Sequence, residues 1–296
     1  MQALLRKEVN SLSDILFING VYSWRFNLLP LLFCNTSRKI VSARGMFHPG
    51  ALSQKSFKKS IYIFFWKLAG LNKKCSFHAS TNEEKKFIEN IFGKKINVFV
   101  AQNFPRIITQ QDPLEKKSDF LKLISIALIS PMKNHLPILK ALEFCNNNIY
   151  YNIYGPVKDY AYWNICLEQI KKLPKNIMVK HYGDIPPQEV EIALSKNHVF
   201  ILPSKSENFG HAIYEALTAG KPVITSNNTP WNNLKISKAG INIEHNNPHE
   251  LSNAINYFAA MNQFEFDEWS NGANKYAARS IDINDIKQQY EEMFYE

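Results

Sequence analysis

The stretch from Pro203 to Trp231, PSKSENFGHAIYEALTAGKPVITSNNTPW, constrains what this chain can fold into more than any other stretch. A short β-rich run, HVFIL, stops at Pro203, and a polar loop leads to Gly210. Apolar residues then recur at helical spacing until Gly220 and Pro222, where a second β-rich run begins. The pattern predicts a strand, a loop, a helix and another strand. Such a loop offers backbone N–H groups and the positive end of a helix dipole to an anion.

Short apolar runs alternate with helical patterns along most of the chain. This alternation is typical of parallel sheets covered by helices, so we expect an α/β protein with two Rossmann-like halves. Strands are expected at 14–19, 39–43, 76–79, 98–101, 121–128, 150–154, 178–182, 199–202 and 223–225. Helices are expected near 24–35, 51–70, 82–92, 134–145, 159–172, 187–196 and 211–219 and throughout 248–295, with an amphipathic helical pattern at 1–12. The mixed stretch 106–119 is typical of a linker.

Composition limits the kinds of partner and the cellular compartment that we expect for this chain. The 296 residues, 45% of them hydrophobic, suffice for two globular domains. The net charge of +9 favours an acidic partner such as a nucleotide diphosphate or an anionic membrane, and no motif supports nucleic acid. The four cysteines lie far apart, which suits reduced thiols, and no apolar run reaches the roughly 18 residues of a membrane span. We therefore expect a cytoplasmic protein, with the inner face of the plasma membrane as an open alternative.

A longer string of residues carries a family resemblance. The pattern P-S-x-x-E-x-F-G, then E-A, A-G-x-P-V-I and S-N-N-T-P-W closely resembles the donor-sugar motif of glycosyltransferase family 4. These are the group 1 glycosyltransferases, retaining enzymes of GT-B fold. The resemblance implies two doubly wound parallel-sheet domains that face a cleft.

The resemblance also implies domain boundaries. It predicts an acceptor-side domain at 1–108, a linker at 109–119, a nucleotide-sugar-binding domain at 120–280 and a C-terminal helix at 281–296 that packs back toward the first domain. The segment DILFIN, at 14–19, looks like the fourth N-terminal strand of the family. We therefore expect a truncated N-terminal domain with an exposed sheet edge, and another chain is a possible source of the absent strands.

Donor contacts follow from the same resemblance. Glu207 would contact the hydroxyls of the donor sugar, and the backbone N–H groups of Asn208, Phe209 and Gly210 would approach the sugar and the diphosphate. Gly210 also has a physical reason to be glycine, which is close approach of backbone to a ligand. Glu215 would accept hydrogen bonds from the ribose hydroxyls.

Two further loops would hold the base. They contain Gly155 and Ile185 and follow strands at the same sheet edge. Ordinary turns explain these two loops nearly as well.

Charge on the leaving diphosphate must be neutralised. No Asp-x-Asp motif or His/Cys cluster is present, so we expect neither a metal nor another cofactor. Lys133, in S-P-M-K-N, matches the family's phosphate-binding lysine and, with Glu207, is a predicted catalytic residue. The family's arginine is replaced by Leu128, which either weakens activity or requires another cation such as Arg44 or His135.

Acceptor-side features are less specific. Arg44 and Gly45 resemble part of a P-R-G motif of a polysaccharide-assembly subgroup, and His78 follows the next strand. A lone histidine there is as often structural as functional. The segment 56–74 has basic ends and aromatic residues in its middle. We interpret it as a core-packed helix, with contact to an anionic membrane near a lipid-linked acceptor as the alternative.

The predicted function is transfer of a hexosyl group from a UDP- or GDP-sugar to a glycan or lipid-linked acceptor. The expected context is capsule, exopolysaccharide or O-antigen synthesis, which includes lipopolysaccharide. A non-catalytic or split nucleotide-sugar-binding module is the main alternative, and a sugar-nucleotide epimerase fits less well.

Overall fold

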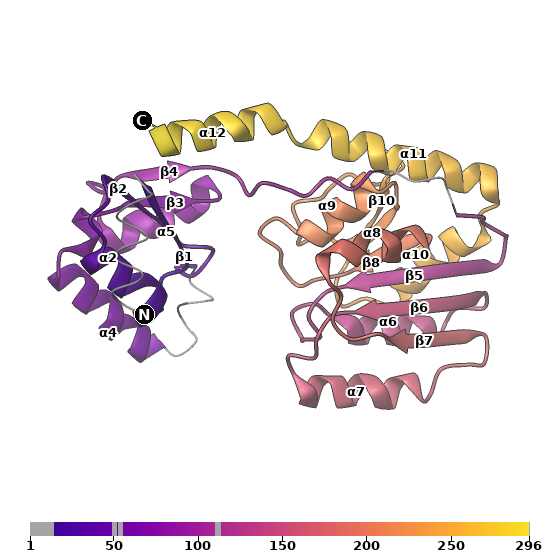
Figure 1. Cartoon of the computed structure of the whole chain (residues 1–296). Helices are drawn as coiled ribbons and strands as arrows, with labels where there is room; N and C mark the ends of the chain where they lie inside the picture. Colours follow the sequence, from indigo (N-terminus) through magenta and orange to yellow (C-terminus); the bar gives the residue numbers. More distant parts are fainter. Residues whose placement is uncertain (1–14, 49–51, 53–55, 110–113, 296) are drawn as a thin grey trace. The chain divides into compact units, whose positions relative to one another are not determined.

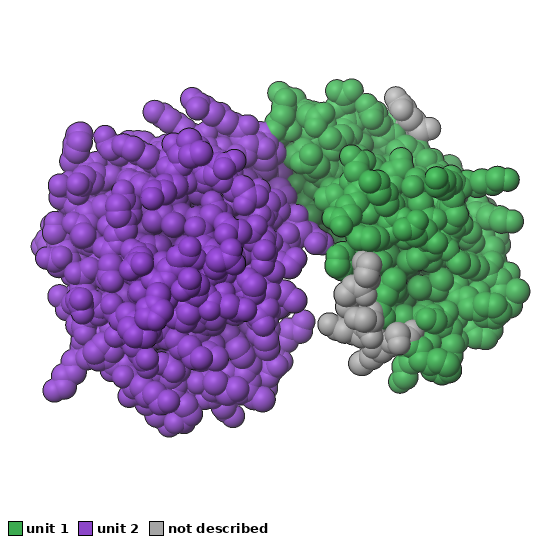
Figure 2. Space-filling view, turned by 180° about the vertical axis from the view of Figure 1, so that it is seen from behind, with its two compact units in different colours: residues 1–104, 282–296 green, residues 105–281 purple. Residues whose placement is uncertain are grey.

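The computed structural model describes residues 15–48, 52, 56–109 and 114–295. The chain divides into two compact units, which Figure 2 colours separately. Unit 1 comprises residues 1–104 and 282–296, and unit 2 comprises residues 105–281. The helical pattern at 1–12 lies outside the described residues, as do the start of the helix expected at 51–70 and part of the linker expected at 109–119.

Unit 1 contains a sheet of four parallel strands in the order β1-β2-β3-β4 (Figure 1). The strands are β1 (Ile15–Asn19), β2 (Arg38–Ser42), β3 (Ser76–Ala79) and β4 (Val98–Val100). Its helical segments are η1 (Trp24–Leu28), α2 (Leu29–Phe33), α4 (Ser56–Leu68), η2 (Leu71–Lys73), α5 (Asn82–Phe92) and α12 (Ile283–Tyr295). The core is aromatic: Trp66 packs edge-on against Phe77, with ring centroids 5.7 Å apart.

Local sequence explains where the helices of unit 1 begin. Ser23 and Thr81 accept hydrogen bonds from the backbone N–H groups of the first turns of η1 and α5, which the helices themselves leave without a partner. At the other end of the chain, α12 joins unit 1 through Met293, which is fully buried, and Phe294, whose ring lies 5.7 Å from that of Phe17.

Unit 2 contains six parallel strands in the order β10-β9-β8-β5-β6-β7. The strands are β5 (Phe120–Ile126), β6 (Asn148–Tyr154), β7 (Ile177–His181), β8 (Val199–Leu202), β9 (Val223–Ser226) and β10 (Gly240–Ile243). The helices are α6 (His135–Leu142), α7 (Tyr160–Ile170), η3 (Pro187–Glu189), α8 (Val190–Ser195), α9 (His211–Thr218), α10 (Pro248–Ala260) and α11 (Gln263–Ser280).

The unit 2 sheet is buried on both faces. In β8, Val199 and Ile201 join one apolar cluster, with α6, α7 and α10, whereas Phe200 and Leu202 join a second cluster, with α8 and α9 (Figure 1). Successive side chains of a strand point to opposite faces, so a strand that is apolar throughout requires helices on both sides. The sheet is therefore doubly wound, and the carboxyl ends of its strands share one edge.

Every expected strand is present, and the structure adds one strand that the sequence pattern does not predict. Strand β10 starts at Gly240, where a Cβ would lie 2.0 Å from the carbonyl oxygen of Val223. Glycine weakens the β-strand pattern in the sequence, but its lack of a side chain allows the close pairing of β10 with β9. The tail, expected to be helical throughout 248–295, consists of three helices, because Asn262 caps α11 in a reciprocal pair with Glu265 and a further break follows α11. Among the described residues, no helix has the length and apolar character to cross a bilayer.

Candidate functional site

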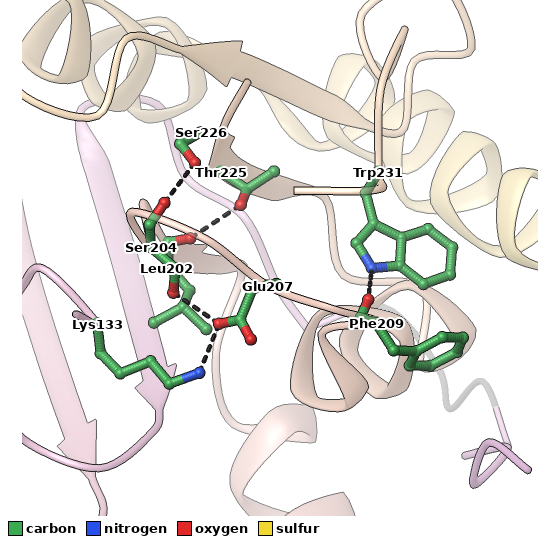
Figure 3. Close-up of polar contacts among 8 residues, drawn as sticks. All are labelled: Lys133, Leu202, Ser204, Glu207, Phe209, Thr225, Ser226 and Trp231. Carbon is green, nitrogen blue, oxygen red and sulfur yellow. Dashed lines mark hydrogen bonds and ion pairs between the residues drawn. The ribbon is translucent and has the colours of Figure 1, made fainter. Parts of the chain in front are cut away.

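The loop between β8 and α9, residues 203–210, is held in place by its neighbours (Figure 3). The hydroxyl of Ser226, at the end of β9, donates to the carbonyl oxygen of Ser204 at 2.5 Å. The indole N–H of Trp231 donates to the carbonyl oxygen of Phe209, also at 2.5 Å. Trp231 is buried and stacks on Tyr214 of α9, with ring centroids 5.4 Å apart. These contacts with neighbouring residues therefore fix the shape of the loop.

Glu207 and Lys133 meet at the centre of this site. The Nζ atom of Lys133 lies 2.6 Å from Oε1 of Glu207, and the Ser204 hydroxyl donates to the same oxygen at 2.7 Å (Figure 3). The side chain of Glu207 is 11% exposed and that of Lys133 is 24% exposed. These residues are 74 positions apart, and they meet because β5 and β8 are adjacent strands. Partial burial strengthens this charge-assisted contact relative to a surface pair.

Asn134 holds the lysine loop against the rest of the site. Its backbone is left-handed, with φ of 64°, and its side-chain N–H groups donate to the carbonyl oxygens of Pro203 and His245. The side chain is buried. Sequence analysis missed Asn134, although an asparagine directly after the candidate lysine is a residue type suited to a left-handed position.

Gly210 allows the loop to turn into α9. It has φ of 78°, and a Cβ there would lie 3.1 Å from Ile213 and 3.2 Å from the indole nitrogen of Trp231. The helix begins at the next residue, and the backbone N–H groups of a first helical turn have no carbonyl partner within the helix. Asn208 and Phe209 precede this turn, so the predicted donor-binding backbone lies where α9 starts.

A pocket of about 320 Å³ in unit 2 brings together three more predicted residues, Gly155, Ile185 and Glu215. Burial raises the pKa of the Glu215 carboxyl, and the charge of Arg106 acts in the opposite direction. At Gly155, with φ of 134°, a Cβ would lie 1.9 Å from the carbonyl oxygen of Ala127. The loop after β6 can therefore approach the end of β5 only because this residue is glycine.

Arg106 is a further functional candidate that the sequence alone does not indicate. It lines the pocket together with Leu128 and Glu215, and its guanidinium donates to the carbonyl oxygen of Pro187. The segment that carries it is held to α9, because the N–H of Ile108 donates to the Thr218 hydroxyl at 3.1 Å. The composition of 106–119 is typical of a linker, and no local pattern indicates that its arginine reaches a pocket.

His135 cannot supply the positive charge that is missing because position 128 is a leucine. Its side chain is fully buried, and among the described residues neither ring nitrogen has a hydrogen-bond partner. Burial lowers the pKa of His135 to about 3, so the ring is neutral at physiological pH. The expectation that His135 replaces the arginine is therefore wrong. Leu128 itself is 40% exposed.

The acceptor-side candidates lie in unit 1, after β2 and on β3. Arg44 is exposed, and its guanidinium donates to the side-chain oxygens of Asn19 and Asn103. The N–H of Gly45 donates to Glu84 at 2.5 Å. His78 is buried, with its two ring nitrogens bonded to the Ser42 hydroxyl and the Ala101 carbonyl, both at 2.8 Å. Burial lowers the pKa of His78, which favours a structural role for a neutral ring.

The arrangement in unit 2 is suited to an anionic ligand with a polar sugar-like group. A lysine, an arginine and the start of a helix supply positive potential, and two glutamates supply acceptors for hydroxyl groups. Glu207 precedes α9 and Glu215 lies on it, so one loop and one helix carry both carboxylates. Within the described part of the chain, no group of three or more His, Cys, Asp or Glu side chains could hold a metal ion.

Comparison with solved structures identifies the fold. HepE of Anabaena, solved with UDP and glucose, aligns with a TM-score of 0.70 at 16% identity over 99% of this chain and 80% of its own. A glycosyltransferase of Rickettsia africae aligns with a TM-score of 0.69 at 17% identity over 99% of this chain and 79% of its own.

A third solved structure covers a smaller share of its own chain. S. aureus TarM, solved with fondaparinux, α-GlcNAc-glycerol and UDP, aligns with a TM-score of 0.69 at 16% identity over 100% of this chain and 59% of its own. The search of curated protein sequences found no significant match.

The family profile described as "Glycosyl transferases group 1" matches residues 107–276, which is more than half of the chain and lies entirely within unit 2. The match includes Lys133, Glu207 and Glu215. The strand order and the geometry of the site are consistent with this profile. The chain belongs to the group 1 glycosyl transferases, with two parallel-sheet α/β units of the GT-B type.

Proposed function

We propose that this protein transfers a hexosyl group from a UDP- or GDP-sugar to a hydroxyl group of a glycan or lipid-linked acceptor. The observation that carries the proposal is the 2.6 Å contact between Lys133 and Glu207 beside the start of α9, the helix that also carries Glu215. HepE was solved with UDP-glucose, and TarM with UDP and α-GlcNAc-glycerol. These ligands support a nucleotide-sugar donor for this chain.

The unit 2 pocket would hold the nucleoside. Glu215 would accept hydrogen bonds from the ribose hydroxyls, and the loops that carry Gly155 and Ile185 would enclose the base. Arg106 lines the same pocket as Leu128 and is charged at all physiological pH values. We assign to Arg106 the role that the family's arginine has at position 128, because among the described residues it is the arginine that lines this pocket.

Lys133 and Glu207 would act at the reacting end of the donor. Lys133 neutralises charge that develops on the leaving diphosphate, and Glu207 accepts hydrogen bonds from the sugar hydroxyls. The bond between the anomeric carbon and the diphosphate oxygen breaks, and the acceptor oxygen bonds to that carbon on the same face. The acceptor proton passes to the leaving phosphate. We propose no metal or other cofactor for this family 4-type, retaining mechanism.

The acceptor side is proposed from the resemblance of Arg44 and Gly45 to a polysaccharide-assembly motif. Arg44 is exposed and close to two asparagine side chains, which is a polar environment suited to sugar hydroxyls. We propose cell-surface polysaccharide synthesis, including capsule, exopolysaccharide or O-antigen, on the cytoplasmic side of the plasma membrane.

Transfer assays with a panel of nucleotide sugars test the proposal. Wild-type protein should release nucleotide from at least one UDP- or GDP-sugar, and Glu207→Ala should lose most of this turnover. Glu168→Ala serves as the matched control, because Glu168 forms an exposed ion pair with Lys171 on α7, away from the loop. Equal turnover by wild type and Glu207→Ala would refute the role of Glu207.

A second candidate function is a nucleotide-sugar-binding module that does not itself catalyse transfer. Leu128 favours it, because a leucine cannot donate hydrogen bonds to phosphate. This candidate predicts nucleotide binding without transfer to any acceptor, or transfer only when a second chain is added. Conversion of one nucleotide sugar into another without an acceptor would instead indicate an epimerase.

A further inference from the structure

The outward face of α4 in unit 1 is apolar. Its exposed large side chains recur at helical spacing, and the exposed fractions are 76% for Phe57, 40% for Ile61, 61% for Phe64, 59% for Phe65 and 70% for Leu68. The opposite side packs into unit 1 through Trp66, which is 1% exposed. A helix on the surface of a globular protein normally places polar residues outward. The interpretation of residues 56–74 as a core-packed helix therefore explains only the side of α4 that carries Trp66.

A second apolar segment lies beside α4. The hydroxyl of Tyr62, on α4, donates to the carbonyl oxygen of Val21 at 2.7 Å, and its ring lies 5.4 Å from that of Tyr22. Directly after these residues, η1 and α2 expose four large side chains. We give the name aromatic face to the exposed large side chains of α4 and of this neighbouring segment: Trp24, Phe26, Leu32, Phe33, Phe57, Ile61, Phe64, Phe65 and Leu68.

The charge of the protein is concentrated in the same part of the sequence. Residues 20–82 contain ten Lys and Arg and no Asp or Glu. The rest of the chain carries 25 Lys and Arg against 26 Asp and Glu, so the net charge of +9 comes from this segment. Lys58 and Lys67 lie on α4 itself, between residues of the aromatic face in the sequence, and the ammonium of Lys67 lies 5.8 Å from the centroid of the Phe92 ring. Lys73 and Lys74 follow at the end of η2.

We propose that unit 1 binds the surface of an anionic phospholipid bilayer through the aromatic face. With 13 residues α4 is about 20 Å long, too short to span a bilayer, and it would lie in the plane of the interface. Phe and Leu side chains would enter the boundary between headgroups and acyl chains, and the lysines would attract anionic headgroups.

The positive charge of this segment favours a bilayer over a second copy of the chain as the partner that covers the aromatic face. Two copies that pair through the aromatic face would bring two strongly positive segments together, and like charges repel. An anionic bilayer covers the same apolar side chains and is attracted by the lysines. This surface belongs to unit 1, so the inference does not depend on the function proposed for unit 2.

Co-sedimentation of the whole chain with vesicles tests the proposal. Binding should be strong to phosphatidylcholine vesicles that contain phosphatidylglycerol, should weaken by about tenfold or more on phosphatidylcholine alone, and should fall with added salt. The double variant Phe64→Ser with Phe65→Ser should reduce binding to the anionic vesicles by about tenfold or more.

The matched control removes two exposed apolar side chains of unit 2. Ile236 is 85% exposed and Phe264 is 74% exposed, and Ile236→Ser with Phe264→Ser should bind vesicles like the wild type. A second variant, Lys58→Glu with Lys67→Glu, removes the charge and keeps the apolar residues. It should also lose binding to anionic vesicles.

Three outcomes would overturn the proposal. The first is equal binding to neutral and anionic vesicles. The second is binding by both α4 variants that equals that of the wild type. The third is the absence of vesicle binding together with a dimer in solution that dissociates in the Phe64→Ser, Phe65→Ser variant. The last outcome would assign the aromatic face to a second copy of the chain. Trp24, 64% exposed, gives an independent readout, because its fluorescence should shift to shorter wavelength on anionic vesicles and Trp24→Phe should remove that change.

Discussion

The two units of this protein place their chemical groups in opposite ways. In unit 2, Lys133 and Glu207 lie together at the ends of adjacent strands, are largely buried, and are held by a loop that neighbouring residues fix. In unit 1, the three phenylalanines of α4 point outward, on a segment with ten cations and no acid. The contrast indicates two kinds of ligand. A small ligand needs paired, preorganised groups, whereas an extended surface needs exposed apolar area and unbalanced charge.

The largest expected effect is a loss of transfer activity on mutation of unit 2 that leaves vesicle binding by unit 1 unchanged. We expect Lys133→Ala to lower transfer turnover by about 10² to 10³, because under the proposed function it removes the charged donor to the leaving diphosphate. The control is Lys171→Ala, whose lysine is 70% exposed and pairs with Glu168 on the surface. Vesicle binding by both variants should equal that of the wild type. A Lys133→Ala protein that transfers at the wild-type rate would remove the contrast between the units.

Nucleotide binding gives the next largest effect. Saturation with UDP or GDP at a hundredfold excess over Kd should stabilise the chain by about 2.7 kcal/mol. For a unit of this size that corresponds to a rise of roughly 5 to 10 °C in the melting temperature. Glu215→Ala and Arg106→Ala should each reduce the rise, whereas Glu168→Ala should leave it unchanged. If no nucleotide at millimolar concentration raises the melting temperature, the pocket of unit 2 does not bind the donor.

A smaller effect concerns the loop that carries Glu207. Trp231→Phe keeps a smaller aromatic ring beside Tyr214 but removes the hydrogen bond to the Phe209 carbonyl, and the lost hydrogen bond alone should cost about 1 kcal/mol of unfolding free energy. Because the loop then loses one restraint, the KM for the donor should rise more than kcat falls. Steady-state kinetics with Tyr276→Phe as control measures this, since Tyr276 donates to the Asn232 carbonyl outside the loop. An unchanged KM would show that Trp231 does not position the loop.

The smallest expected effect is a pH dependence from Glu215. Burial raises the pKa of its carboxyl in the folded chain above the value in the unfolded chain, so the folded state binds this proton more tightly. Stability without nucleotide should therefore increase as the pH falls through the folded-state pKa. Nucleotide binding should weaken over the same range, because the ribose hydroxyls need the carboxylate as acceptor.

The pH effect has a direct control in Glu215→Gln. This variant cannot titrate at position 215, so both trends should be absent from it. Melting scans with and without UDP across the acidic range measure the two trends together. If Glu215→Gln and the wild type change alike with pH, the titrating group is another residue.

Several features of the fold and the site follow from local sequence. The strand, loop and helix around Gly210 are specified by an apolar run, a proline, a glycine and helical spacing within about twenty residues. Glu207 and Glu215 belong to that same stretch, and Lys133 is close to the end of an equally clear strand. The residues that share the outward face of α4 also follow from spacing alone.

Other features were decided only by the tertiary structure. Lys133 meets Glu207 because β5 and β8 pair, Arg106 reaches the pocket because its segment is held to α9, and His135 is neutral because the core of unit 2 closes over it. Helical spacing groups Phe57 with Phe64 and Phe65, but it does not say whether they face the core or the solvent. The physical reason is range: periodicity and caps depend on residues a few positions apart, whereas pairing, burial and charge state depend on groups that only packing brings together.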